Sequence, residues 1–320
     1  MKSAYRPATL VGMSRLKEYA VLAGRTIKRM PMPTWVYTSG FGKARVAQPG
    51  GAVLKKHAVD VSIVARTRVV WLDRHKAANG IILHIHGGSY VSGPFSWDWQ
   101  WMSDQADRRE CAAVLVDYRH APDYPHPTAL VDCEEVVAQL ARDEVLRESN
   151  WILSGQQAGG GIALALAERL GHGAEDKDVA VPAPSGLVLM SPWWDLELHN
   201  VDITATEQRD PVHERRILEL AAKAYAGSTP LDDPALSPVN ANLEALPPIH
   251  LSVGMKDIFL TDTRIMKLQF ERQGLDVDYR ECAGKLVGMG RLPRGADAKR
   301  LFDEQAAFIR SRLGEPTRLS

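Results

Sequence analysis

Residues 151–160 read Trp-Ile-Leu-Ser-Gly-Gln-Gln-Ala-Gly-Gly, a short apolar run followed by a glycine-rich turn that opens a helical pattern. Comparable apolar runs recur at residues 81–86, 112–117, 186–191 and 249–253, with helix-length segments between them. Strands that are apolar on both faces and separated by helices are typical of a parallel sheet covered on both sides. The sequence therefore predicts an α/β fold.

Two further patterns extend this prediction toward the chain ends. The segments 57–66 and 69–73 alternate apolar and polar residues, which predicts half-buried antiparallel strands before the parallel ones. Helical periodicity predicts helices over 10–27, from Ser96, Pro125, Ala158 and Leu260, and over 297–313. The expected architecture is a mostly parallel sheet of about eight strands flanked by helices.

Composition excludes several classes of partner. The 320 residues carry 39 Lys plus Arg and 39 Asp plus Glu, so no net charge attracts nucleic acid or an anionic membrane. The three cysteines, Cys111, Cys133 and Cys282, have no metal-ligand spacing and are expected to be reduced thiols. No signal peptide and no membrane-spanning run is recognised, so we expect a cytoplasmic protein.

The first chemically informative motif is His-Ile-His-Gly-Gly-Ser-Tyr at residues 84–90, directly after an apolar strand. Consecutive small residues let backbone N–H groups turn toward a cavity, as in an oxyanion hole. A tight strand-to-loop turn is the structural alternative. His84 and His86 alternate on one strand, but no carboxylate or cysteine lies near them in sequence, so we expect no metal site.

Three more segments accompany these two motifs, at residues 114–129, 191–196 and 254–259. Taken in order, the motifs resemble those of the hormone-sensitive-lipase family of α/β-hydrolases over roughly residues 57 to 313. The resemblance implies a core of residues 51–320 and a helical cap, built from residues 1–50 and an insertion at about 195–235. It further implies a small-molecule ligand or substrate, no cofactor, and a homodimer as one oligomeric state.

Residue by residue, the resemblance assigns an oxyanion hole to the amides of Gly87, Gly88 and Ala158. His86 and Ser89 belong to the same loop and are expected to contact a ligand. In the family pattern, Asp257 is the acid of a catalytic triad.

Two catalytic positions depart from the family pattern. Gln157 stands where the family has its nucleophilic serine, and a carboxamide cannot attack an ester as an alkoxide does. The last histidine in the sequence is His250, which precedes Asp257, so the family's histidine is absent downstream. Lys285 lies within a residue or two of that histidine position, where an ion pair with Asp257 is favoured over proton transfer.

These departures predict little ordinary ester hydrolysis, because losing a serine hydrolase nucleophile or base costs on the order of 10⁶ in kcat. We expect the pocket to act without an acyl-enzyme, either as a small-molecule binding site or in lyase, cyclase or isomerase chemistry. The alternative is a weak esterase that uses a water positioned by Gln157. A hydroxyl or thiol held against a histidine would overturn this interpretation.

Other residues receive structural interpretations. Trp97, Trp99 and Trp101 alternate after the oxyanion loop and are expected to pack in the interior or line the cap. His120 and His126 flank a turn and are expected to be solvated. Nothing in the sequence indicates an activated thiolate at Cys282.

Overall fold

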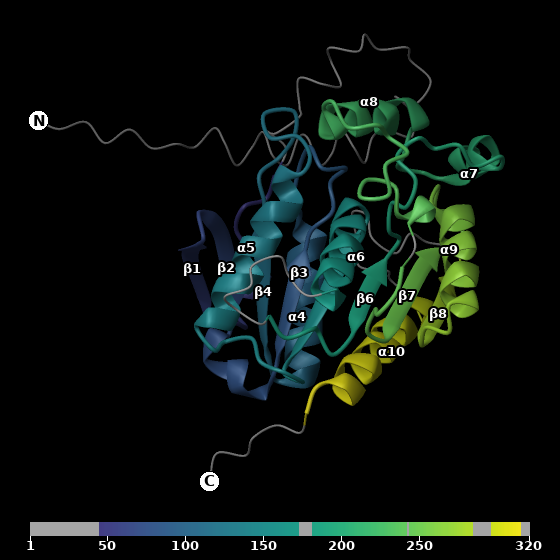
Figure 1. Cartoon of the computed structure of the whole chain (residues 1–320). Helices are drawn as coiled ribbons and strands as arrows, with labels where there is room; N and C mark the ends of the chain where they lie inside the picture. Colours follow the sequence, from purple (N-terminus) through teal and green to yellow (C-terminus); the bar gives the residue numbers. More distant parts are fainter. Residues whose placement is uncertain (1–44, 173–180, 242, 284–295, 315–320) are drawn as a thin grey trace, which may run out of the picture.

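The structure, a computed structural model, describes residues 45–172, 181–241, 243–283 and 296–314. Its centre is one eight-stranded sheet with strand order β1-β2-β4-β3-β5-β6-β7-β8 (Figure 1). The strands are β1 Val59–Val64, β2 Thr67–Leu72, β3 Ile81–Ile85, β4 Ala112–Asp117, β5 Trp151–Gln156, β6 Leu187–Met190, β7 Ile249–Gly254 and β8 Val277–Cys282.

The pairing confirms the predicted sheet. β1 pairs with β2 and β2 with β4 in antiparallel fashion, and all other neighbours are parallel. Every residue of β3, β4, β5, β6 and β7 is buried, whereas the side chains of β1 are a mixture of exposed and half-buried ones. This difference follows from position, because the inner strands are covered on both faces and the edge strand is not. The expectation that residues 69–73 are half-buried is wrong, because β2 is buried except at Arg68.

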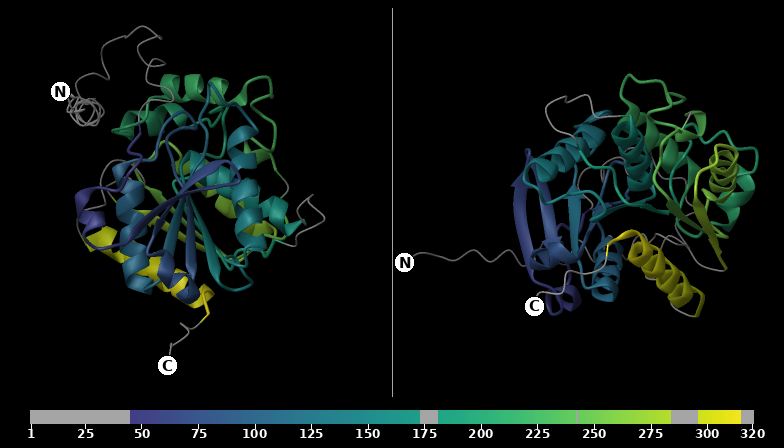
Figure 2. Two further views of the ribbon diagram at one scale, coloured as in Figure 1. Left: turned by 90° about the vertical axis from the view of Figure 1, so that its left-hand side faces the viewer. Right: turned by 60° about the horizontal axis from the view of Figure 1, so that its bottom comes forward.

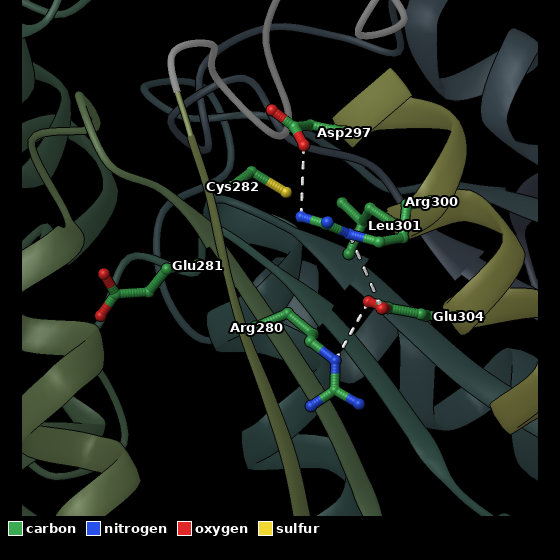
Figure 3. A pocket seen from close by; sticks show the side chains of 7 residues that line it. All are labelled: Arg280, Glu281, Cys282, Asp297, Arg300, Leu301 and Glu304. Carbon is green, nitrogen blue, oxygen red and sulfur yellow. Dashed lines mark hydrogen bonds and ion pairs between the residues drawn. The ribbon is translucent and has the colours of Figure 1, made fainter. Parts of the chain in front are cut away.

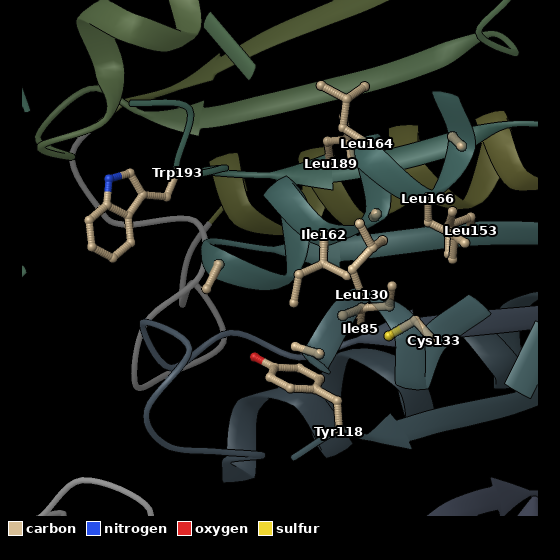
Figure 4. Packing of buried hydrophobic residues seen from close by; sticks show 14 of the residues in the cluster. Ile85, Tyr118, Leu130, Cys133, Leu153, Ile162, Leu164, Leu166, Leu189 and Trp193 are labelled. Atoms are coloured by element: carbon tan, nitrogen blue, oxygen red, sulfur yellow. The ribbon is translucent and has the colours of Figure 1, made fainter. Parts of the chain in front are cut away.

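Helices cover both faces of the sheet (Figure 2). One apolar cluster, part of which is drawn in Figure 4, joins the sheet to α5, α6 and α9. A second cluster joins the other face of the sheet to α4 and α10. The helices are α3 Gly51–Leu54, α4 Ser96–Arg109, α5 Thr128–Arg142, α6 Ala158–Gly171, α7 Ile203–Arg209, α8 Arg215–Ala226, α9 Leu260–Arg272 and α10 Ala296–Arg312, with 3-10 turns η1 Arg74–Asn79 and η2 Pro238–Asn240.

The long connection between β6 and β7 contains α7 and α8, which stand above the carboxyl ends of the strands (Figure 1). This is the part of the chain where the insertion at about 195–235 was expected. The predicted helix over 10–27, and all but the last six residues of the predicted segment 1–50, lie outside the described residues.

The tryptophans after the oxyanion loop lie mainly in the core. Trp99 and Trp101 are buried on the sheet face covered by α4 and α10, and the indole N–H of Trp101 donates to Gln305. Trp97 is half-buried and stacks on Phe95. The packing interpretation is confirmed for the two buried rings.

One predicted helix begins later than expected. α5 starts at Thr128 and not at Pro125, because residues 125–128 form a turn in which the Thr128 amide donates to the Pro125 carbonyl. Among the described residues, no helix is both long enough and apolar enough to cross a membrane.

Candidate functional site

The site is organised by a sharp turn between β5 and α6. Gln157, the residue at this turn, has φ 50° and ψ −116°, a conformation that L-residues rarely adopt. A strand passes abruptly into a helix here, as in the turn called a nucleophile elbow. The structure thus places the Gln157 side chain at the sharp turn that the sequence motif predicted.

Two glycines permit this turn. A Cβ on Gly159 would lie 2.1 Å from the carbonyl oxygen of Ile85, and one on Gly155 would lie 2.2 Å from the carbonyl oxygen of Gly159. Neither approach is possible for any other residue. The glycines therefore bring the first turn of α6 against the end of β3, beside the loop that follows that strand.

That loop directs two backbone donors at the elbow. The Gly88 amide donates to Oε1 of Gln157 at 2.8 Å, and the Ser89 amide donates to the same oxygen at 3.1 Å. Gly88 has φ +113°, and a Cβ there would lie 2.1 Å from the Ser92 carbonyl oxygen. The loop has the geometry expected of an oxyanion hole, and the oxygen bound in it belongs to the protein itself.

The other end of the same amide is also bound. Nε2 of Gln157 donates to Oγ of Ser89 at 3.0 Å, and it lies 3.3 Å from Nε2 of His213. The Gln157 residue is only 2% exposed. The carboxamide is therefore held at both ends in a closed site.

His213 comes from the segment between α7 and α8. Its Nδ1 lies 2.7 Å from Oδ2 of Asp210, a carboxylate that also accepts the backbone amides of Val212, His213 and Ile258. Because Asp210 holds a proton on Nδ1, Nε2 keeps its lone pair and accepts from Gln157. An imidazole that is oriented by a carboxylate is a common arrangement for a histidine general base.

Asp257 completes the cluster. It is 1% exposed, and its Oδ1 accepts the Phe259 amide at 3.0 Å. One of its carboxylate oxygens lies within 4.8 Å of a carboxylate oxygen of Asp210 and of a ring nitrogen of His213. Burial raises the pKa of Asp257 to about 7, and the neighbouring Asp210 carboxylate adds to the rise. Burial opposes ionisation of Asp210 too, but the interaction with His213 and the backbone hydrogen bonds to the carboxylate lower the Asp210 pKa below its ordinary value. One carboxyl is thus poised to exchange a proton near neutral pH, and the other stays ionised.

The structure brings most of the predicted site residues together. Gln157, Gly88 and Ser89 are in hydrogen-bond contact, and a Cβ on Gly87 would lie 3.3 Å from Oε1 of Gln157. Ala158 follows Gln157 as the first residue of α6 and is fully buried. Lys285 lies outside the described residues.

Two expectations about histidines are wrong. The site was expected to lack a histidine in the place of a general base, because none follows Asp257 in sequence, but His213 reaches it from the insertion. His120, expected to be solvated, is only 8% exposed because it packs edge-on against His86 and Tyr118. His126 is half-buried, with Nδ1 3.4 Å from the hydroxyl of Tyr225.

Sequence patterns did not single out Asp210 or His213. The signal available is their spacing of three residues immediately before the amphipathic helix α8, within an insertion above the strand ends. An Asp and a His so spaced at a helix entry can bond to each other, but the same pattern is common on ordinary surfaces. Only the folded chain shows that both are buried at the elbow.

Two buried serines do lie against histidines, which is the contact that an ordinary esterase site requires. Nε2 of His57 is 2.8 Å from Oγ of Ser103, and Nδ1 of His84 is 3.0 Å from Oγ of Ser154. Both imidazole side chains are 0% exposed, and each also bonds to a buried aspartate. These are polar networks inside the core that no substrate can reach, so they do not restore an esterase site.

A separate cavity lies between β8 and α10 (Figure 3). Four of its charged side chains pair with one another, Arg280 with Glu304 and Arg300 with Asp297. Burial raises the pKa of the adjacent Cys282 to about 11, so this thiol is protonated at neutral pH. None of the residues that line this cavity belongs to the elbow.

Comparisons with known proteins agree with the fold. A family described as the α/β hydrolase fold matches residues 82–289. An esterase from Acinetobacter venetianus is 32% identical over 209 residues, which cover 65% of this chain and 67% of that protein. An acetyl-hydrolase from Streptomyces hygroscopicus is 26% identical over 257 residues, 80% of this chain and 84% of the relative.

Solved structures show the same fold. The crystal structure of an esterase from the bacterial hormone-sensitive lipase family matches 98% of this chain and 100% of its own, with a TM-score of 0.77 and 23% identity. An esterase/lipase from an uncultured bacterium matches 91% of this chain and 98% of its own, with a TM-score of 0.75 and 24% identity.

Proposed function

Because the chain belongs to the α/β-hydrolase family, of the hormone-sensitive-lipase type, we propose that it is an esterase-like protein whose pocket works without an acyl-enzyme. In this proposal the pocket binds a small molecule that carries a carbonyl or carboxylate group. The ligand is either held unchanged or rearranged by proton transfer, as in a lyase, cyclase or isomerase.

The observation that carries the proposal is the position of the Gln157 carboxamide. Its Oε1 accepts hydrogen bonds from both Gly88 and Ser89, in the place where a family enzyme would bind the oxygen of its substrate. Its nitrogen is a poor nucleophile because the lone pair is delocalised into the carbonyl. The degenerate elbow therefore supports recognition of an oxygen-bearing group and gives no support to acyl transfer.

A ligand binds in this proposal by replacing the internal amide. The ligand's oxygen takes the two backbone donors when the Gln157 side chain turns away, and the released Nε2 remains available as a further donor. The elbow residues are buried beside the segment between α7 and α8, so entry requires that segment to move. Affinity is reduced by the free energy of breaking the internal contacts.

The proton-transfer form of the proposal uses the cluster above the elbow. His213, oriented by Asp210, faces the bound oxygen-bearing group through its Nε2. Asp257, with a pKa of about 7, is a second group that can exchange a proton under the same conditions. Two backbone donors would stabilise negative charge that develops on the ligand oxygen during such a transfer.

Hydrolysis is the second candidate, and a specific observation favours it. The Asp210 and His213 pair lies within hydrogen-bond distance of the elbow, and relatives of the chain are named esterase and acetyl-hydrolase. A water positioned by Gln157 and deprotonated by His213 could attack an activated ester. Such general-base assistance typically contributes about 10² to 10⁴-fold, far less than a complete triad.

Two measurements separate these functions. Thermal-shift screening with small carboxylates and ketones, followed by mass spectrometry of each hit, shows whether the ligand is returned unchanged. Hydrolysis of p-nitrophenyl acetate by wild type, His213→Ala and the matched control His199→Ala, an exposed histidine, tests the alternative. Ester turnover that is lost only in His213→Ala would establish hydrolysis and contradict the non-hydrolytic proposal. Equal background rates in all three proteins would support the non-hydrolytic proposal.

A further inference from the structure

A second cluster of side chains lies beneath the oxyanion loop, outside the site described above. His86 follows β3, Asp117 ends β4, and His120 lies three residues further on. The two strands are parallel neighbours, with Ile85 opposite Val116, so the residues that follow them meet at one edge of the sheet. One ligand atom from each of the three side chains lies within 4.8 Å of the others.

Each of these three side chains has one buried polar atom without a partner among the described residues. Within the part of the chain that the structure describes, Nε2 of His86, Nε2 of His120 and Oδ1 of Asp117 are buried and have no hydrogen-bond partner. The three residues are 0%, 8% and 7% exposed. Each unpartnered buried polar atom costs about 1–3 kcal/mol, so three together in a single cluster indicate a missing common partner.

The rest of the cluster favours a cation as that partner. Nδ1 of His86 lies 2.7 Å from the Gly87 carbonyl oxygen, which fixes its proton on Nδ1 and leaves the lone pair on Nε2. Nε2 of His120 is likewise buried and without a partner among the described residues. An imidazole binds a metal through such an unprotonated ring nitrogen.

The carboxylate is held in place from its other side. Oδ2 of Asp117 accepts from Arg45 at 2.5 Å and from Arg68 at 2.8 Å, and Oδ1 is left without a partner among the described side chains. The two guanidinium groups also repel a dication, so the affinity is expected to be weaker than that of a closed structural zinc site. A stack of His86 on Tyr118, with ring centroids 4.3 Å apart, fixes the orientation of one imidazole.

We infer that His86, Asp117 and His120 bind one divalent transition-metal ion, Zn²⁺ in the first instance, beneath the oxyanion loop. Two imidazoles and one carboxylate suit zinc and related first-row ions and are poor ligands for Mg²⁺ or Ca²⁺. The ion fastens the end of β3 to the loop after β4 and so steadies the loop that carries Gly88 and Ser89. It takes no part in the proposed pocket chemistry.

This site was not expected from the sequence. In sequence, His86 lies beside His84 on the same predicted strand, and no carboxylate is close to either. The structure pairs it instead with Asp117 and His120 from the adjacent strand, while His84 bonds to Ser154 and Asp98. The ligands become visible only once the strand order is known.

The test uses the full-length chain, stripped with a chelator and then titrated with Zn²⁺, with Mg²⁺ and Ca²⁺ as comparison ions. Isothermal titration calorimetry and elemental analysis after gel filtration should give one zinc per chain. His120→Leu and Asp117→Asn should weaken zinc binding by at least about 10 to 100-fold. His126→Leu, a half-buried histidine in the same loop, is the matched control and should bind as wild type does.

Melting temperatures measured with and without zinc distinguish a loss of zinc binding from a folding defect. In the metal-free state His120→Leu should melt no lower than wild type, because it removes an unpartnered buried nitrogen. Zinc should then raise the Tm of wild type and of His126→Leu but not that of His120→Leu. The inference fails if wild type binds no zinc, or if His120→Leu retains wild-type affinity and Tm response.

Discussion

Nε2 of His213 lies 3.3 Å from Nε2 of Gln157, so an imidazole from the insertion contacts the residue at the elbow. In a complete triad the corresponding contact joins the general base to the nucleophile. The elbow, the backbone donors and an oriented histidine are therefore all present around a side chain that cannot act as a nucleophile. This relationship makes the site open to direct engineering.

Gln157→Ser should create esterase activity. The new hydroxyl would occupy the elbow with the oxyanion hole vacated, and His213 would be the nearest base. We expect p-nitrophenyl acetate hydrolysis to rise by about 10² to 10⁴-fold over wild type, with an initial burst, because only part of a complete triad's rate is recovered.

His213→Ala in the Gln157→Ser background serves as the control and should remove most of the gain. A Gln157→Ser enzyme no faster than wild type, although folded, would show that His213 is not placed to act as a base.

Gln157→Ala should empty the oxyanion hole. The amides of Gly88 and Ser89 then lose their acceptor, so the free energy of unfolding should fall by about 1–3 kcal/mol in chemical denaturation. Acetate at millimolar concentrations should restore stability in this variant more than in wild type, because its carboxylate can take the vacated donors. An equal effect of acetate on both proteins would argue against a hole filled by Gln157.

Asp257→Asn should change how stability depends on pH. The pKa of Asp257 is about 7 in the folded chain, against an unperturbed value of 3.8. The unfolded chain therefore releases the proton first, and wild-type stability falls as pH rises from about 4 to 7, by up to about 4 kcal/mol. Asparagine stays neutral throughout, so the variant should gain stability relative to wild type over this window and match its trend below pH 4. Parallel Tm curves from pH 4 to 8 would contradict the raised pKa.

Gly159→Ala should be severely destabilising. Its Cβ would lie 2.1 Å from the Ile85 carbonyl oxygen and 2.4 Å from that of His86, and backbone cannot yield cheaply. We expect a loss above about 3 kcal/mol, at the high end of single substitutions. Gly50→Ala, where the built Cβ meets no atom within 4 Å among the described residues, should stay within about 0.5 kcal/mol of wild type. Similar Tm values for the two variants would disprove the close approach of α6 to β3.

The sheet could be predicted because its signals are local. Predominantly apolar runs such as residues 112–117 and 249–253 indicate strands buried on both faces, and the glycines around Gln157 indicate the turn. The elbow, the Gly88 loop and Asp257 follow from motifs whose spacing is fixed by the fold. These elements required no knowledge of contacts between distant segments.

The rest of the site could not be predicted because it depends on such contacts. His213 reaches the elbow only through the packing of the insertion above the strand ends, 56 residues from Gln157 in sequence. The conformation of the Gln157 side chain, turned into the hole formed by Gly88 and Ser89, is likewise a tertiary outcome. The metal cluster arises from strand order, which places His86 beside Asp117.

Intact-protein mass spectrometry of wild type, quenched with acid after brief reaction with p-nitrophenyl acetate, tests the central claim most directly. With Gln157 in the nucleophile position, the chain should keep its unmodified mass and release p-nitrophenol without a burst, while Gln157→Ser should gain one acetyl group. An acetyl adduct formed stoichiometrically on wild type, at any residue of the pocket, would contradict the account.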